Sequence, residues 1–224
     1  TSSASQGGHL KLFSDDGAAM GSGHRLGVLE FGGAEDTSST ITIGAKIEVL
    51  ADAAWSATEN GADMVFYTTD GNASQSEVMR ITADNLVGIG TTSPVSPLHI
   101  YENTTNVDST AGLTIEQAGT GDAIIQFLET GTQRWVVGLD NSDSDKFKIS
   151  SDGDLNSNAR LTIDTSGNVG IGISSPDGKV HIESGSAGTI STLSYADELI
   201  IENSGAAGIS IRTPDANSGS ISWQ

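Results

Sequence analysis

The sequence Val87-Gly-Ile-Gly-Thr-Thr-Ser-Pro94, followed by Leu98-His-Ile100, occurs in this chain in two closely similar copies. The second copy is Val169-Gly-Ile-Gly-Ile-Ser-Ser-Pro176, followed by Val180-His-Ile182, and it begins 82 residues after the first. A fixed period of this length is typical of stacked supersecondary units. The repeat therefore predicts an array of modules rather than one globular core.

Within each copy, apolar residues and glycines alternate, which indicates an extended strand. Side chains of a strand point alternately to its two faces, so Val87 and Ile89 share one face, and Gly88 and Gly90 share the other. Glycine weakens a strand, so alternate glycines suggest that a neighbour presses closely against the bare face. We expect that neighbour to be another chain. The proline that follows should end the strand, because it lacks the N–H that the ladder needs.

We predict that the apolar residues of both copies line a core shared between subunits, and that the glycines permit close approach. The predicted shared-core residues are Val87, Gly88, Ile89, Gly90, Leu98, Ile100, Val169, Gly170, Ile171, Gly172, Val180 and Ile182.

The composition argues against a large conventional core. The 224 residues include 28 glycines, 5% are aromatic, and 36% are hydrophobic. That hydrophobic fraction is below the ~45–50% usual for soluble globular domains. No hydrophobic pattern of helical period is visible. Subunits that share one core can offset such a deficit, so the composition favours an obligate oligomer.

Charge and residue usage exclude several classes of function. Ten basic and 29 acidic residues give a net charge of −19, which repels phosphate backbones and anionic lipid. No apolar run approaches the ~20 residues that a membrane-spanning helix needs. We therefore expect neither nucleic-acid binding nor membrane insertion. The absence of cysteine excludes disulfides, thiolate zinc sites and cysteine nucleophiles.

Short runs of alternating apolar and polar residues predict strands along most of the chain. The first unit has expected strands at residues 10–13, 25–31, 40–43, 45–49, 64–68, 78–82, 87–90 and 98–101. The second has them at 112–116, 123–128, 134–138, 146–149, 160–164, 169–172 and 180–183, and a third begins with 198–202, 209–211 and 221–223. Residues 51–58 are expected to form a loop. We predict modules at 1–103 and 104–185 and the start of a truncated third at 186–224, with more protein after Gln224.

Several segments resemble the repeated shaft modules of bacteriophage tail-fibre proteins. They are Ala45-Lys-Ile-Glu-Val49, Asp63-Met-Val-Phe-Tyr-Thr-Thr-Asp-Gly71, Glu77-Val-Met-Arg-Ile-Thr82, both parts of the first repeat, and Arg160-Leu-Thr-Ile-Asp-Thr-Ser-Gly-Asn-Val-Gly-Ile-Gly172. The resemblance implies an all-β, elongated, intertwined homotrimeric fibre built from repeated antiparallel β modules, located on a virion and therefore extracellular. It also makes the shared core a trimer core. Many members of the family end in an intramolecular chaperone, but nothing after Gly185 resembles one, and no receptor-binding tip is recognisable.

Candidate metal ligands are few. His99 and His181 occupy the same point of each unit, and three copies around an axis could chelate an ion. Alternation, however, places each histidine opposite its apolar neighbours, so we expect it to face solvent or a surface groove. The acidic runs 140–145 and 152–154 lack the spacing of a helix-loop-helix calcium site and are expected to be solvated loops. We predict no metal site and no cofactor.

No catalytic arrangement is visible either. The chain has no Ser-His-Asp order, phosphate-binding loop or metalloprotease motif. A glycan hydrolase needs paired carboxylates beside aromatic sugar platforms, whereas this chain has only three tryptophans and three tyrosines. Trp135 lies in an apolar strand, where we expect it to pack in a core. We therefore expect no enzymatic activity and no catalytic residues.

These observations predict a structural component of a bacteriophage tail fibre or related virion fibre, forming a trimeric shaft that positions a host-recognition tip. The expected partners are two further copies of the chain and other fibre or baseplate proteins. The alternative is an adhesin-like module that contacts host surface polysaccharide directly, and a tailspike-type glycan hydrolase is a weaker one. Aromatic residues clustered on loops would favour direct glycan binding.

Overall fold

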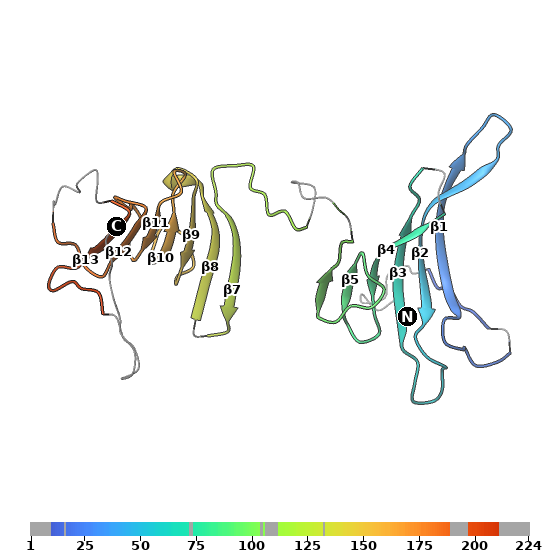
Figure 1. Cartoon of the computed structure of the whole chain (residues 1–224). Coiled ribbons are helices and arrows are strands. Elements are labelled where there is room, and N and C mark those ends of the chain that lie inside the picture. The colour runs from blue at the N-terminus through green and yellow to red at the C-terminus, as the bar shows by residue number, and fades with distance from the viewer. Residues whose placement is uncertain are drawn as a thin grey trace, which may run out of the picture. The chain divides into compact units, whose positions relative to one another are not determined.

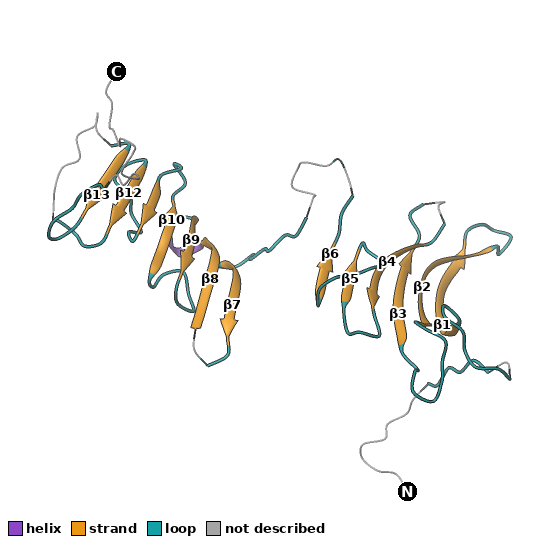
Figure 2. Cartoon of the chain, turned by 60° about the horizontal axis from the view of Figure 1, so that its bottom comes forward, coloured by secondary structure: helices purple, strands orange, loops and turns teal. Residues whose placement is uncertain are grey.

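The computed structural model describes residues 10–15, 17–71, 74–103, 105, 112–131, 133–188 and 197–210. Over these residues the chain is all-β, as expected, and its one helical element is the short 3-10 turn η1 (Asn141–Asp143). None of the described helical structure is long and apolar enough to cross a membrane. The chain divides into two compact units, residues 1–113 and 114–224, and each contains one sheet (Figures 1 and 2).

The first unit is a six-stranded sheet in which every strand pairs with the next one along the chain. Its strands are β1 (Arg25–Ala34), β2 (Ile41–Ala51), β3 (Ala62–Thr68), β4 (Ser76–Ile81), β5 (Val87–Ile89) and β6 (Leu98–Ile100). The pairs from β1 to β5 are antiparallel, whereas β5 and β6 are parallel.

The second unit repeats this arrangement in a seven-stranded sheet. Its strands are β7 (Ala123–Glu129), β8 (Gln133–Asp140), β9 (Lys146–Ser150), β10 (Ala159–Ile163), β11 (Val169–Ile171), β12 (Val180–Glu183) and β13 (Leu199–Glu202). The pairs from β7 to β11 are antiparallel, and β11, β12 and β13 are parallel. Strand β13, from the segment expected to begin a third module, thus belongs to this second sheet.

The expectation of antiparallel modules is therefore confirmed only in part, because both sheets also contain parallel pairs. Parallel neighbours ordinarily need a crossover of about a dozen residues or more. Here β5 is only three residues long, so the chain has only about 10 Å to retrace before it starts β6. The segment that contains Ser93-Pro94 makes this short return. The N–H of Val87 bonds to the carbonyl of Pro97, and that of Tyr101 to Ile89, which fixes the parallel register.

The turn before each parallel step has the same construction in both units. Asn85 and Gly167 occupy equivalent positions in the β4–β5 and β10–β11 turns, and both have positive φ, 63° and 77°. Asparagine and glycine are the residues that most readily adopt this left-handed conformation. In the second turn, the Asp164 carboxylate also accepts bonds from the backbone N–H groups of Ser166 and Asn168. Local sequence therefore explains why each hairpin closes here.

Three expected strands are absent from the described chain. Residues 10–13, 113–116 and 209–210 have no regular structure, while 211 and 221–223 lie outside the described residues. The first of these segments still packs on the sheet, since a Cβ added at Gly27 of β1 would lie 2.9 Å from the Cβ of Leu12. The two short runs expected at 40–43 and 45–49 form one strand, β2. Its pairing with β1 contains a register shift, so Gly44 has no paired residue in β1.

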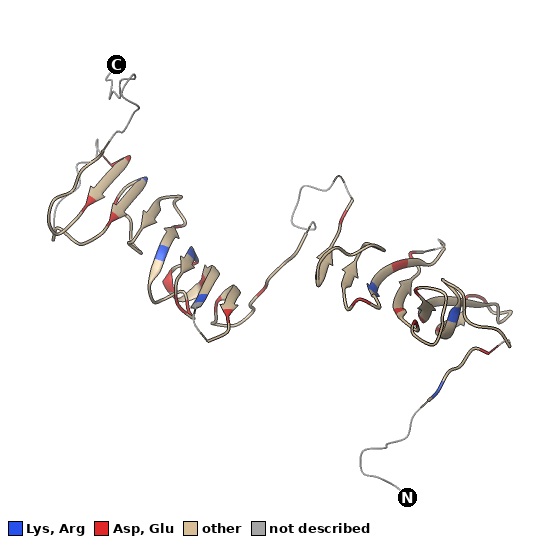
Figure 3. Ribbon diagram, turned by 90° about the horizontal axis from the view of Figure 1, so that it is seen from below, with Lys and Arg blue, Asp and Glu red and all other residues tan. Residues whose placement is uncertain are grey.

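Few side chains are buried in the described residues, and most of those are polar. The buried apolar residues are Met20, Ala51, Val65, Val136 and Leu155. The buried polar residues are Glu48, Asp63, Asp140, Lys148, Ser150, Thr162 and His181. Charged residues accordingly lie along the strands as well as in the loops (Figure 3). A monomeric globular domain normally shows the opposite distribution, with apolar side chains inside and charged ones outside.

Candidate functional site

The predicted shared-core residues lie side by side in both units. In the first, Val87 pairs with Leu98 and Ile89 with Ile100, and the antiparallel neighbours on β4 are Ile81 and Met79. In the second, Val169 and Ile171 pair with Val180 and Ile182, and β10 and β13 extend both rows. We call these rows the apolar ladders. The ladders of the second unit are Ile163-Val169-Val180-Leu199 and Leu161-Ile171-Ile182-Ile201.

The apolar ladders are only partly covered within one chain. Leu98 is 57% exposed and Leu199 is 51% exposed, and Ile89, Ile100, Ile171 and Ile182 are also exposed. Val87, Val169 and Val180 are half-buried. The residues expected to form a core therefore make an apolar face that this chain itself does not bury.

The expectation that another chain presses on the glycine face is wrong for these residues, because the neighbour is the chain's own backbone. A Cβ added at Gly88 would lie 2.7 Å from the carbonyl oxygen of Thr91, and one at Gly170 would collide with that of Ile173. Gly90 and Gly172 have φ of 73° and 78°, and a Cβ there would collide with the carbonyl oxygens of Tyr101 and Glu183. The return loops cover Gly88 and Gly170, and the end of the next parallel strand approaches Gly90 and Gly172, so only glycine fits at these positions.

The histidines lie on the same inner face, so the expectation that they face solvent or a surface groove is also wrong. His99 is half-buried and His181 is only 1% exposed. Register explains their position, because Gly88 pairs with His99 and Gly170 with His181. Alternation correctly predicted that each histidine lies on the opposite face of the strand from its apolar neighbours. It did not predict that this polar face is the inner one.

A buried ion cluster fixes the inner face of the second unit. The ammonium of Lys148 lies 2.7 Å from Asp140 Oδ2 and 2.6 Å from Asp143 Oδ2. Asp140 also accepts hydrogen bonds from the Ser142 hydroxyl and the Asp143 N–H, and thereby caps η1. The run 140–145 was expected to be a solvated loop, which is wrong for Asp140, since it is fully buried.

The charges in this cluster shift the pKa values of its members. Burial raises the pKa of Asp140, but hydrogen bonds from Lys148 and Ser142 outweigh it, so the net pKa is lowered. The pKa of Asp143 is lowered by the same balance, in which the hydrogen bonds from Lys148 and Lys146 prevail over burial. Burial lowers the pKa of Lys148, yet the two aspartates raise it overall. All three groups are therefore held in their charged forms.

The first unit has comparable networks of its own. Glu48 is buried and pairs with Lys46 at 2.9 Å and Arg25 at 3.0 Å. Burial, together with a hydrogen bond to Glu48, raises the pKa of Tyr67 to about 12. Arg80 binds Asp63 and donates two parallel bonds to Glu77. The charged side chains of the polar inner faces are thus paired within the chain, whereas the apolar faces stay exposed.

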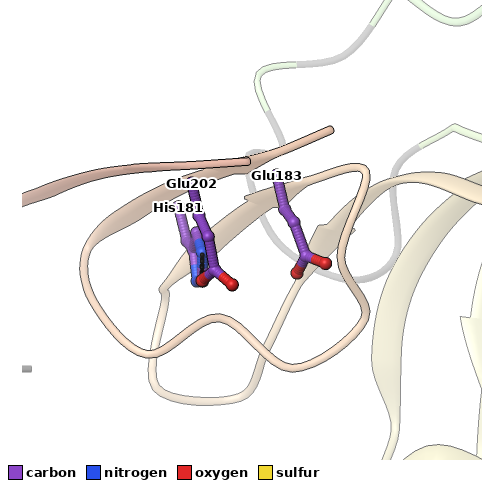
Figure 4. Close-up of side chains that lie close together, drawn as sticks. All are labelled: His181, Glu183 and Glu202. Carbon is purple, nitrogen blue, oxygen red and sulfur yellow. Dashed lines mark ion pairs between the residues drawn. The ribbon is translucent and has the colours of Figure 1, made fainter. Parts of the chain in front are cut away.

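One group of side chains has the composition of a metal site. His181, Glu183 and Glu202 each offer a ligand atom, and these atoms lie within 4.8 Å of one another (Figure 4). The sequence pattern indicated the histidine but neither of the glutamates. A signal was available, because Glu202 ends the predicted strand at 198–202, but only the parallel register of β13 brings it opposite Glu183.

The described aromatic residues lie both in strands and in loops, and the loop residues Phe13 and Trp55 line one pocket. Trp135 was expected to pack in a core. It lies in β8 and is 39% exposed, so it is not packed in a core of this chain. Trp55 lies in the loop between β2 and β3, where its indole N–H donates to the carbonyl of Gly61. Trp223 lies outside the described residues.

The sequence matches no protein-family model, and no curated protein matches it. Among solved structures, one neighbour is the carboxy-terminal domain of the bacteriophage T5 L-shaped tail fibre with its intramolecular chaperone domain. The TM-score is 0.41 and the identity 11%, and the match covers 100% of this chain and 71% of that one. A second is the carboxy-terminal domain of the same fibre, with a TM-score of 0.40, 12% identity, and 95% and 98% of the two chains covered.

This chain resembles a bacteriophage tail-fibre domain in structure.

Proposed function

We propose that this chain is a segment of the shaft of a bacteriophage tail fibre or related virion fibre, in which three copies associate through their apolar ladders. Its role is mechanical and not enzymatic: the shaft holds a host-recognition tip away from an extracellular particle. Its partners are two further copies of itself and other fibre or baseplate proteins at its ends. Two observations motivate the family assignment, namely the repeat with its period of 82 residues and the tail-fibre-like motifs.

The observation that carries the proposal is the inverted burial of the strands. In β9 to β12 the inward residues are Lys148, Thr162, Gly170 and His181, all buried, while the outward residues are the half-exposed members of the apolar ladders. Contiguous exposed apolar patches of this kind mark association surfaces in soluble proteins. Because the polar face is covered by loops and its charged residues are paired, the apolar face is the one left to meet a partner.

Self-association is the natural way to cover these ladders. Both units carry the same rows of residues in the same register, so equivalent faces recur along the chain. Copies of one chain arranged around an axis can place identical faces against one another at every repeat, which gives a closed, symmetric core. Such a core supplies the apolar burial that 36% hydrophobic content cannot supply within one chain.

Light scattering on two matched double variants tests this proposal. The wild-type chain is expected to have the mass of three chains in native buffer and of one in strong denaturant. Replacing Leu98 and Ile100 by glutamate places charges in an apolar ladder and should give a smaller species. The control replaces Thr92 and Ser93, exposed loop residues before β6, by glutamate, and it should remain trimeric.

A monomeric wild-type chain would contradict the proposal. So would a trimer that survives the ladder substitutions unchanged, since the association would then use another surface. Circular dichroism on both variants distinguishes lost association from lost strand structure.

A further inference from the structure

We propose that His181, Glu183 and Glu202 bind one divalent transition-metal ion, for which zinc is the probe. The site lies within one unit of one chain. The proposal therefore does not depend on the fibre function or on the number of chains that associate.

The parallel pairing of β12 and β13 places the three side chains on one face. Glu183 lies directly opposite Glu202, and His181 lies opposite Ile200, two residues before Glu202. Since side chains alternate along each strand, all three project to the same side, and Figure 4 shows them pointing the same way. One ligand atom from each lies within 4.8 Å of the others. The register thus gathers one nitrogen and two carboxylate donors.

The charge of this group is not balanced by a neighbouring cation. Like charges directly opposite each other on paired strands repel and weaken the pairing. Among the described residues, no lysine or arginine forms an ion pair with Glu183 or Glu202. Glu202 Oε2 faces the His181 imidazole, and its Oε1 accepts a hydrogen bond from the backbone N–H of Ala187. A bound cation between the carboxylates would turn this repulsion into attraction.

The buried histidine provides a second, independent observation. His181 is 1% exposed, and its Nε2 atom is buried without a hydrogen-bond partner. Glu202 Oε2 lies 3.2 Å from this nitrogen, but the two groups are poorly aligned for a hydrogen bond. Buried polar atoms are almost always satisfied in folded proteins, so an unsatisfied nitrogen facing two carboxylates needs a partner. A metal ion at that point satisfies all three groups.

The other ring nitrogen determines what binding requires. His181 Nδ1 accepts a hydrogen bond from the N–H of Asp177 at 3.3 Å, so the neutral ring carries its hydrogen on Nε2. A metal ion needs the lone pair of Nε2, and the hydrogen must therefore move to Nδ1. Binding then breaks the contact with Asp177, which is long for a hydrogen bond between these atoms.

The donor set selects the class of metal. Imidazole nitrogen together with carboxylate oxygen suits zinc and its transition-metal neighbours, whereas calcium and magnesium prefer oxygen alone. Ligands about 2.0–2.2 Å from one tetrahedral zinc ion lie about 3.4 Å apart. The ligand atoms here lie within 4.8 Å of one another, so the carboxylates must rotate toward the histidine to close the set. Three protein ligands leave a fourth position for water.

The first unit lacks this site although it repeats the histidine. His99 occupies the same position in β6, but the residue two places later is Tyr101, whose ring packs edge-on against His99 at 6.3 Å. Over the described part of the chain that sheet also ends at β6, so no counterpart of β13 is seen there to supply the second carboxylate. In the second unit, an ion would join β13 to β12 and strengthen a parallel pair only four residues long.

Zinc titration of the metal-stripped full chain by isothermal calorimetry tests the site. We expect one zinc ion per chain, and at least tenfold weaker binding in both Glu183→Gln and Glu202→Gln. These substitutions keep the shape of two partly exposed side chains, so they should fold. The matched control is Glu198→Gln, an exposed acid just before β13 that removes the same charge without touching the cluster.

Each possible result decides for or against the site. One zinc ion, lost in the two cluster variants, kept in the control and not displaced by calcium, supports it. No zinc binding overturns it. Equal weakening in Glu198→Gln also overturns it, and so does displacement by an equal concentration of calcium. In either case the ion would be attracted by the net negative charge of the chain and not bound by this cluster. Cobalt in place of zinc should show the intense visible bands of a four-coordinate site.

Discussion

At the residue scale, the structure depends on buried charges that are fully paired. Lys148 and Asp140 lie inside the second unit, and Asp143 and Ser142 complete their hydrogen bonds. A buried charge that loses its partner is strongly destabilising, because the remaining charge stays out of water without compensation. The short segment from Asp140 to Lys148, which includes η1, is therefore held in one conformation by the charges at its ends.

The lowered pKa values of Asp140 and Asp143 predict a loss of stability in acid. A carboxyl whose pKa is lower in the folded than in the unfolded chain stabilises the fold above its unfolded pKa, here about 3.8. That contribution is lost as pH falls through the lower folded value. The melting temperature should therefore drop between pH 5 and pH 2, and less steeply in Asp140→Asn. An equal slope in both proteins would contradict this role.

At the element scale, the parallel step that ends each unit depends on glycine. In both copies the strand leaves through a glycine with positive φ whose missing Cβ makes room for the backbone of the next strand. The carbonyl concerned belongs to Tyr101 in the first unit and to Glu183 in the second. A side chain at this point would push the two parallel strands apart.

Two glycines of the second unit separate backbone strain from steric exclusion. Gly172 and Gly167 have nearly the same φ, 78° and 77°, but only Gly172 has backbone beside its missing Cβ. Gly167→Ala should cost about 1–2 kcal/mol of unfolding free energy, from the left-handed conformation alone. Gly172→Ala should cost a further 1–3 kcal/mol or so, because a backbone carbonyl must also move. Urea denaturation measures both, and equal costs would show that the close approach is unimportant.

At the scale of the whole molecule, the apolar ladders make the folded state of one chain incomplete. Exposed leucine and isoleucine recur on the outward faces of both units, while the interior of each is small and polar. In the trimer proposed above, stability comes largely from association, so it depends on the concentration of chains.

The melting temperature should therefore rise with protein concentration. We expect a clear increase over a thirtyfold range of chain concentration, and little or no dependence in the variant with glutamate at Leu98 and Ile100. Calorimetric scans at several concentrations and a fixed scan rate measure it. A wild-type melting temperature that stays constant over that range would indicate a chain that is stable alone.

Much of the fold followed from local sequence. The repeat fixed the two equivalent endings, alternation placed nearly all the strands, and Asn85 and Gly167 mark the turns that precede each parallel step. The tail-fibre resemblance also came from short motifs. Segments such as 113–116 carried a strand pattern without forming one, because a strand also needs a pairing partner that the pattern does not specify.

The sequence by itself determined that this protein is all-β, that it is modular, and that each strand has one apolar and one polar face. Only the tertiary structure decided which face is inside, which strands are parallel, and that Glu202 lies beside His181 and Glu183. The physical reason is that alternation in the sequence distinguishes the two faces of a strand but does not specify which of them is buried. Which face becomes the interior depends on the loops that fold back over the strands, and these contacts are set by the path of the chain.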